Sequence, residues 1–216
     1  VFLPQQYGVI TEMYAYVAFL IILLTYGMET AYFRFSTKGD HEPRSIFSTV
    51  LSSLIGSTAL FILMAIIFAQ PIADWLMYPN NKEYVVWFGI IVGLDAIASI
   101  PLARLRTENR AKTFATINIV NVLVYLGFNF FFLSYCLPLV AEGGSNWLTD
   151  TFYDPNTGVG YVFIANLIAS GVKFLLLTPT MLRGLTKPDL KLLKPMLIYS
   201  LPLLVAGLAG MMNEMF

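Results

Sequence analysis

The stretch YVVWFGIIVGLDAIASIPLA, residues 84–103, with RLRTENRAK directly after it at 104–112, decides the fold of this chain. An apolar run of about 20 residues, wound as a helix that rises about 1.5 Å per residue, spans the roughly 30 Å hydrocarbon core of a bilayer. The dense basic segment that follows is typical of a loop that stays on the cytoplasmic side during insertion. The stretch therefore predicts a transmembrane helix with a fixed orientation.

Five more apolar runs occur in the chain, at residues 10–33, 46–69, 114–141, 158–182 and 196–216. The 216 residues are 57% hydrophobic and 12% charged, whereas soluble domains are about 45–50% apolar and about 25% charged. Unpaired backbone groups are too costly in lipid, so spanning segments are helices, and a barrel would need alternating segments of about 10 residues. We predict an all-α, polytopic transmembrane bundle of six helices.

The connectors between the runs alternate in charge. Twelve of the thirteen Lys and Arg residues fall in the first, third and fifth connectors or at the helix ends leading into them, and Lys82 is the exception. This pattern predicts that loops 34–45, 104–113 and 183–195 are cytoplasmic. Most connectors are short, so neighbouring spans are expected to pack as antiparallel hairpins. Residues 2–8 are predicted to form a loop.

Small residues and prolines predict local features of the spans. Ser52 with Gly56, and Gly89 with Gly93, are spaced four apart, which lets helix backbones approach closely in lipid. Pro101 and Pro179 lie near the basic ends of the third and fifth spans, where a proline can kink a helix or free backbone groups.

Ionisable residues within apolar runs are the first candidates for function, because charges in lipid are costly. Asp95 lies in the middle of the third span, so it must be protonated, paired or facing a wet cavity. Lys173 is either a cavity cation or an interfacial anchor with its ammonium drawn to water. Glu29 and Arg34 could contact substrate or form salt bridges at a helix end. Glu214 lies deep in the last run.

Other residue classes narrow the chemistry. Amides in the fourth and fifth spans, including Asn129, either bond a neighbouring helix or contact sugar hydroxyls. The net charge of zero gives no reason to expect a nucleic-acid partner. A single Cys136 excludes an internal disulfide, and the one histidine excludes a multi-histidine metal centre. With no Gly-rich phosphate loop or metalloprotease motif, we expect no catalytic residue, metal or cofactor.

Four stretches resemble the polysaccharide flippases of the multidrug/oligosaccharidyl-lipid/polysaccharide exporter superfamily, in particular the bacterial lipopolysaccharide and O-antigen branch. They are PQQYGV at 4–9, YGMETAYFRF at 26–35, PLARLRTENRA at 101–111 and SLPLLVAG at 200–207. The resemblance implies that residues 1–216 are helices two to seven of the family, most of one helical bundle cut at both ends, with a second bundle missing. It also implies a multi-pass protein of the bacterial cytoplasmic membrane.

The resemblance further implies a transporter rather than an enzyme. Its partners would be a lipid-linked oligosaccharide, membrane lipids and other polysaccharide-assembly membrane proteins. Pyrophosphate or glycan would be bound by basic and amide groups: Arg34, Arg104, Arg106, Lys173 and Asn129. Asp95 is proposed on its burial alone, and together with Glu29 it would bind a coupling proton or cation. The alternatives are a multidrug or cation antiporter of the same superfamily and a membrane-embedded glycan polymerase or glycosyltransferase.

Overall fold

The structure is a computed structural model that describes residues 4–77 and 79–215, and all regular elements in this part of the chain are helices. Six of its segments are long and apolar enough to cross a membrane. The prediction of an all-α bundle with six spans is therefore confirmed. The side chain of Glu214 lies outside the described part.

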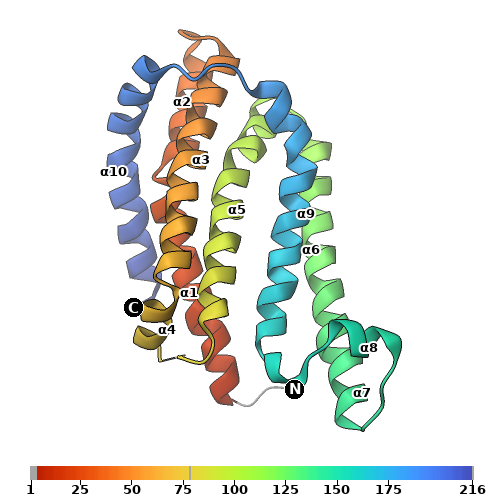
Figure 1. Ribbon diagram of the computed structural model, residues 1–216. Helices are drawn as coiled ribbons and strands as arrows, with labels where there is room; N and C mark the ends of the chain where they lie inside the picture. Colours follow the sequence, from red (N-terminus) through yellow and green to blue (C-terminus); the bar gives the residue numbers. More distant parts are fainter. Residues whose placement is uncertain (1–3, 78, 216) are drawn as a thin grey trace.

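Figure 1 shows the spans side by side, with the chain passing up and down through the bundle. The first span is α1 (Pro4–Thr25) with α2 (Met28–Lys38), the second is α3 (Pro43–Ile67) followed by the short α4 (Ala69–Trp75), and the third is α5 (Lys82–Thr107). The fourth is α6 (Ala111–Asn129), continued by a π-helical segment (Phe130–Cys136) and α7 (Leu137–Ala141). Then come α8 (Trp147–Phe152), a 3-10 turn (Pro155–Thr157), α9 (Gly160–Gly184) and α10 (Leu190–Met215).

The connectors alternate between the two ends of the bundle, as the charge pattern predicted. Residues 39–42, 108–110 and 185–189 lie at one end, called the basic end below, and residues 76–77, 79–81 and 142–159 lie at the opposite end. The connectors at the basic end are shorter than predicted, because hydropathy marks the apolar middle of a helix and misses its polar ends. The predicted loop at 2–8 is wrong for residues 4–8, which begin α1, while residues 2 and 3 lie outside the described part.

Helix α5 is the centre of the bundle. In the most apolar 18-residue stretch of α5, 61% of the residues are buried, whereas the corresponding share in every other span is at most 44%. A Cβ on Gly89 would lie 2.9 Å from the Cβ of Ala65, and one on Gly93 would lie 2.8 Å from Cγ2 of Thr58. The prediction that Gly89 and Gly93 allow close helix packing is therefore confirmed, and the helix that they pack against is α3. The same prediction for Gly56 is wrong, since that residue is exposed and has open space around it.

The last span does not pair with the span before it, so the hairpin prediction is wrong there. The connector crosses the basic end, and α10 packs against α1, α2 and α3 (Figure 1). Two buried hydroxyls of α3 hold the connector. Ser48 Oγ donates to the Thr186 carbonyl at 2.5 Å, and Thr49 Oγ1 accepts from the Asp189 N–H at 2.9 Å. Apolar runs could not have predicted this crossing, because it depends on two polar side chains.

The first span is broken between α1 and α2. Tyr26 has φ 33° and Gly27 has φ 70°, and positive φ is a strained conformation for a bulky aromatic residue. A Cβ on Gly27 would lie 2.7 Å from the Ser200 carbonyl oxygen of α10, so only glycine fits. By contrast, α5 and α9 continue through Pro101 and Pro179. The discontinuity therefore falls at a residue pair that hydropathy does not mark.

The connector between the fourth and fifth spans contains the short helix α8. Asn146 and Thr149 form a reciprocal cap: the Asn146 side chain accepts from the Thr149 N–H at 2.9 Å, and Thr149 Oγ1 accepts from the Asn146 N–H at 2.9 Å. Such pairs satisfy the free N–H groups at a helix start. The spacing Asn-x-x-Thr was a readable signal for this helix.

Candidate functional site: a polar cluster at mid-membrane

An ion pair joins the middles of two spans. Lys173 Nζ of α9 lies 2.5 Å from Asp95 Oδ1 of α5, and the two side chains are 13% and 21% exposed. Ser170 Oγ donates to the same carboxylate oxygen at 3.3 Å. Both charged residues lie near the midpoints of their helices. Moving a charge out of water costs about several kcal/mol unless a partner compensates. Each residue therefore offsets the cost of burying the other's charge at this depth.

A second set of polar contacts continues the cluster to α1 and α6. Asn166 Nδ2 donates to the Tyr14 hydroxyl at 3.1 Å, and the hydroxyls of Tyr14 and Tyr125 lie 3.3 Å apart. Asn166, Ser170 and Lys173 are spaced four and three residues apart, so they form one polar stripe along α9. The stripe contacts Asp95 of α5 and Tyr14 of α1, and Tyr14 extends the cluster to Tyr125 of α6.

Sequence reasoning found only part of this cluster. Asp95 and Lys173 were predicted separately, and Asn166 was covered as one of the amides. Ser170, Tyr14 and Tyr125 were missed, since hydroxyls are common in membrane helices and carry little signal alone. The four-then-three spacing on α9 could have added Ser170.

The other predicted site residues lie apart from the cluster. Glu29 of α2 forms an ion pair with Arg106 of α5 at the basic end, where both side chains are more than a third exposed. The prediction that Glu29 forms a helix-end salt bridge is therefore confirmed. Arg34 stacks over the Tyr199 ring at 4.1 Å instead of pairing with an acid.

Arg104 is held in place by three contacts. Its Nε donates to Glu108 Oε1 at 2.6 Å, its NH1 donates to the Thr180 carbonyl at 3.3 Å, and its guanidinium lies 4.6 Å from the centre of the Phe47 ring. It lies nine residues beyond Asp95, about 13 Å further along α5. Asn129 donates its side-chain N–H to the Tyr125 carbonyl of its own helix at 2.8 Å.

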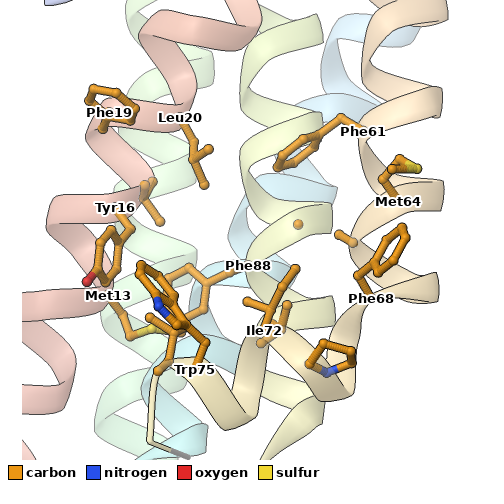
Figure 2. Close-up of a pocket in the computed structure, with 16 residues that line it drawn as sticks. Met13, Tyr16, Phe19, Leu20, Phe61, Met64, Phe68, Ile72, Trp75 and Phe88 are labelled. Carbon is orange, nitrogen blue, oxygen red and sulfur yellow. The ribbon is translucent and has the colours of Figure 1, made fainter.

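Two cavities lie outside the polar cluster. The larger, of 650 Å³, is almost wholly apolar and opens between α1, α3, α4 and α5 towards the opposite end. Figure 2 shows aromatic side chains around it, including Tyr16, Phe61 and Trp75. The smaller, of 230 Å³, lies at the basic end between α2, α3 and α5. Neither is lined by Asp95 or Lys173, so the ion pair is closed off from both in this conformation.

The cluster offers charge and hydrogen bonding but no metal-binding set. Among the residues that the structure describes, no group of three or more His, Cys, Asp and Glu side chains could hold a metal ion. What the cluster can do is exchange a proton or change its pairing when the helices move, because a carboxylate at mid-membrane tolerates its charge only beside a partner.

Six spans and a charged, hydrogen-bonded centre define a multi-pass membrane protein with a polar core. The comparison with protein families is specific: the family model described as "Polysaccharide biosynthesis protein" matches residues 2–140. The chain belongs to this family, and the resemblance seen in the sequence is confirmed. Three of its four stretches lie within the match, while 200–207 lies beyond it. Neither the curated proteins nor the solved structures gave a match. The protein thus has a role in polysaccharide synthesis or export at a membrane.

Proposed function

We propose that this protein moves a lipid-linked oligosaccharide from the inner to the outer leaflet of the bacterial cytoplasmic membrane by alternating access. The observation that carries the proposal is the mid-membrane pair of Asp95 and Lys173. Polar groups at this depth are rare and by default mark a transport pathway. Membership of the polysaccharide biosynthesis family supports a glycan as the cargo.

In this account Asp95 is the coupling group. When Asp95 binds a proton or cation it releases Lys173, and the two helices are then free to separate. Lys173, once released, is available to the pyrophosphate of the cargo. The broken first span supports such movement, since transporters use discontinuous helices at their working parts. The bundle works opposite a second one, with the cargo between them.

Charge sets the proposed orientation. The basic end faces the cytoplasm, because Lys and Arg in short loops are retained there. Arg34, Arg104 and Arg106 attract the pyrophosphate at that face, as guanidinium groups suit phosphate. Glu29 modulates this attraction through its pair with Arg106. Asn129 contacts the glycan after its internal bond to α6 opens.

The test is polysaccharide export in cells that depend on this protein. We expect Asp95→Asn to lower export at least about tenfold per molecule of protein present in the membrane, because a group that changes charge during transport has been lost. Asp150→Asn is the matched control, since Asp150 is an exposed acid on α8, and it should export normally. Normal export by Asp95→Asn would remove Asp95 from the mechanism.

The same cells separate the proposal from its alternatives. A multidrug or cation antiporter would lose cytotoxic-cation resistance in the Asp95→Asn variant and keep glycan export. A glycan polymerase or glycosyltransferase would leave the lipid-linked unit on the outer leaflet but unpolymerised. If the protein is a flippase, the Asp95→Asn variant leaves the lipid-linked unit on the inner leaflet.

A further inference from the structure

The smaller cavity at the basic end has the chemistry of an anion site. It is lined by Tyr32 and Ser36 of α2, Pro43 and Arg44 at the start of α3, and Arg104, Thr107 and Glu108 at the end of α5. Three separate helices thus bring two guanidinium groups and three hydroxyl residues around a volume of 230 Å³. Such a set matches the oxygens of a phosphate, to which arginine binds by paired N–H donors.

Ser36 supplies an independent sign that this cavity suits a polar ligand. Its Oγ is buried and has no hydrogen-bond partner. The next residue, Thr37, bonds the Phe33 carbonyl of its own helix at 3.0 Å, as helical hydroxyls commonly do. Leaving a buried hydroxyl without a partner is costly. A phosphate oxygen in the cavity is the kind of acceptor that the Ser36 hydroxyl lacks.

The two arginines have donors to spare. Arg44 is exposed and takes part in no ion pair among the described residues. Arg104 uses its Nε and one NH1 bond on Glu108 and Thr180, and a guanidinium has five N–H donors. The Tyr32 hydroxyl lies 3.5 Å from Thr107 Oγ1, which is a weak bond that a charged acceptor would replace.

One acid lines the cavity, and its charge is matched. Glu108 accepts from Arg104 at 2.6 Å and lies 3.7 Å from Arg110 NH1. With Arg44 and Arg104 both facing the cavity and Arg110 beside the acid, the surroundings are net positive. A phosphate therefore meets an attractive field in spite of the carboxylate.

We infer that this cavity binds the phosphate of an anionic membrane phospholipid. The cavity lies where the spans end, which is the depth of lipid headgroups, and basic residues at that depth attract anionic lipids. Arg104 is shared with the capture of cargo proposed above and lies about 13 Å from Asp95 along α5, whereas Arg44, Ser36 and Tyr32 take no part in that capture. The inference does not require transport, since a resident lipid would hold α2, α3 and α5 together.

The experiment is native mass spectrometry of the purified protein with phosphatidic acid, and with diacylglycerol as the lipid that lacks phosphate. We expect phosphatidic acid to bind at least about tenfold more tightly. Arg44→Gln should lose roughly tenfold in affinity and Ser36→Ala roughly threefold, with the unfolding temperature of each variant unchanged or raised. The control Arg183→Gln removes an exposed arginine elsewhere at the basic end and should stay within about twofold of wild type.

Two results would overturn the inference. Equal losses in Arg44→Gln and Arg183→Gln would mean that only general surface charge is at work. If inorganic phosphate at millimolar concentration displaced the lipid or raised the unfolding temperature as much, the ligand would be a soluble anion. Because binding is measured without transport, failure here leaves the export test of Asp95 untouched.

Discussion

Asp95 and Lys173 each carry a charge that neither could keep alone at mid-membrane. Their contact of 2.5 Å, with Ser170 as a further donor, is what lets α5 and α9 pack closely at that depth. Breaking a buried pair by removing one partner is strongly destabilising, whereas replacing both partners by uncharged side chains is often neutral. This asymmetry separates the structural part of the pair from any part it plays in transport.

We expect Asp95→Asn and Lys173→Met each to lower the free energy of unfolding by roughly 3 kcal/mol, because each leaves one buried charge unpaired. The neutral pair variant, which carries both substitutions, should recover most of that loss. Unfolding of the purified protein in detergent, followed by circular dichroism, measures all three. Additive losses in the neutral pair variant would show that the two residues are not energetically coupled.

Tyr14 joins α1 to the cluster through its hydroxyl alone. Tyr14→Phe should therefore cost about 1 kcal/mol of stability, the usual size of a hydrogen bond between membrane helices. Tyr16→Phe is the control on the same helix, since the Tyr16 hydroxyl contacts Glu12 on the exposed surface at 3.2 Å, and it should be close to neutral. Equal effects of the two changes in a thermal unfolding assay would contradict a central role for the Tyr14 contact.

At the scale of residues, the sequence identifies the candidate functional residues, but it does not identify their contact partners. Asp95 and Lys173 are conspicuous because charge is rare in lipid. Their pairing depends on how two helices are rotated, and apolar runs with a small periodic signal do not determine that. Glu29 with Arg106 was predicted only as a salt bridge to some neighbour, and its partner lies 77 residues away.

At the scale of elements, the break between α1 and α2 is the feature with the clearest consequence. Gly27→Ala should lower the unfolding temperature, because the residue has φ 70° and faces the Ser200 carbonyl. Gly39→Ala has a similar φ of 76° but open space around it, so it measures the strain without the clash. Gly56→Ala, at an open helical position, should be neutral or stabilise by about 0.5–1 kcal/mol. If Gly27→Ala and Gly39→Ala lowered the unfolding temperature equally, the close approach of α10 to Gly27 would make no contribution to stability.

The six spans were predictable from length and hydropathy, and their interruptions were not. Hydropathy runs continuously through Tyr26 and Gly27. It also runs through the π-helical segment Phe130–Cys136, which ends two residues before Pro138. Proline lacks the N–H that a regular helix would use. Helix α8 had a readable signal in the capping pair of Asn146 and Thr149.

At the scale of the whole molecule, the alternation of connectors fixes which positions share a side of the membrane. Cysteine labelling tests this in a Cys136→Ala background, because Cys136 is the one native cysteine. Lys38→Cys and Arg183→Cys should react with an impermeant maleimide only from the cytoplasm, and Lys82→Cys only from outside. Labelling of Lys82→Cys and Arg183→Cys from the same compartment would refute the topology.

The order of spans along the chain was predictable and their arrangement in space only in part. Hairpin packing holds for α3 with α5, where Gly89 and Gly93 allow contact. It fails for α9 and α10, because Ser48 and Thr49 hold the connector across the basic end. Such long-range polar contacts join residues about 140 apart in the chain, and local patterns contain no information about them.

The most direct test of a coupling role for Asp95 and Lys173 is the rate at which the purified protein in proteoliposomes flips a fluorescent lipid-linked oligosaccharide. The comparison is wild type against the neutral pair variant, whose stability should be close to that of wild type. If the pair drives transport, the neutral pair variant flips at least about tenfold more slowly. Flipping at the wild-type rate would mean that the pair only holds the helices together.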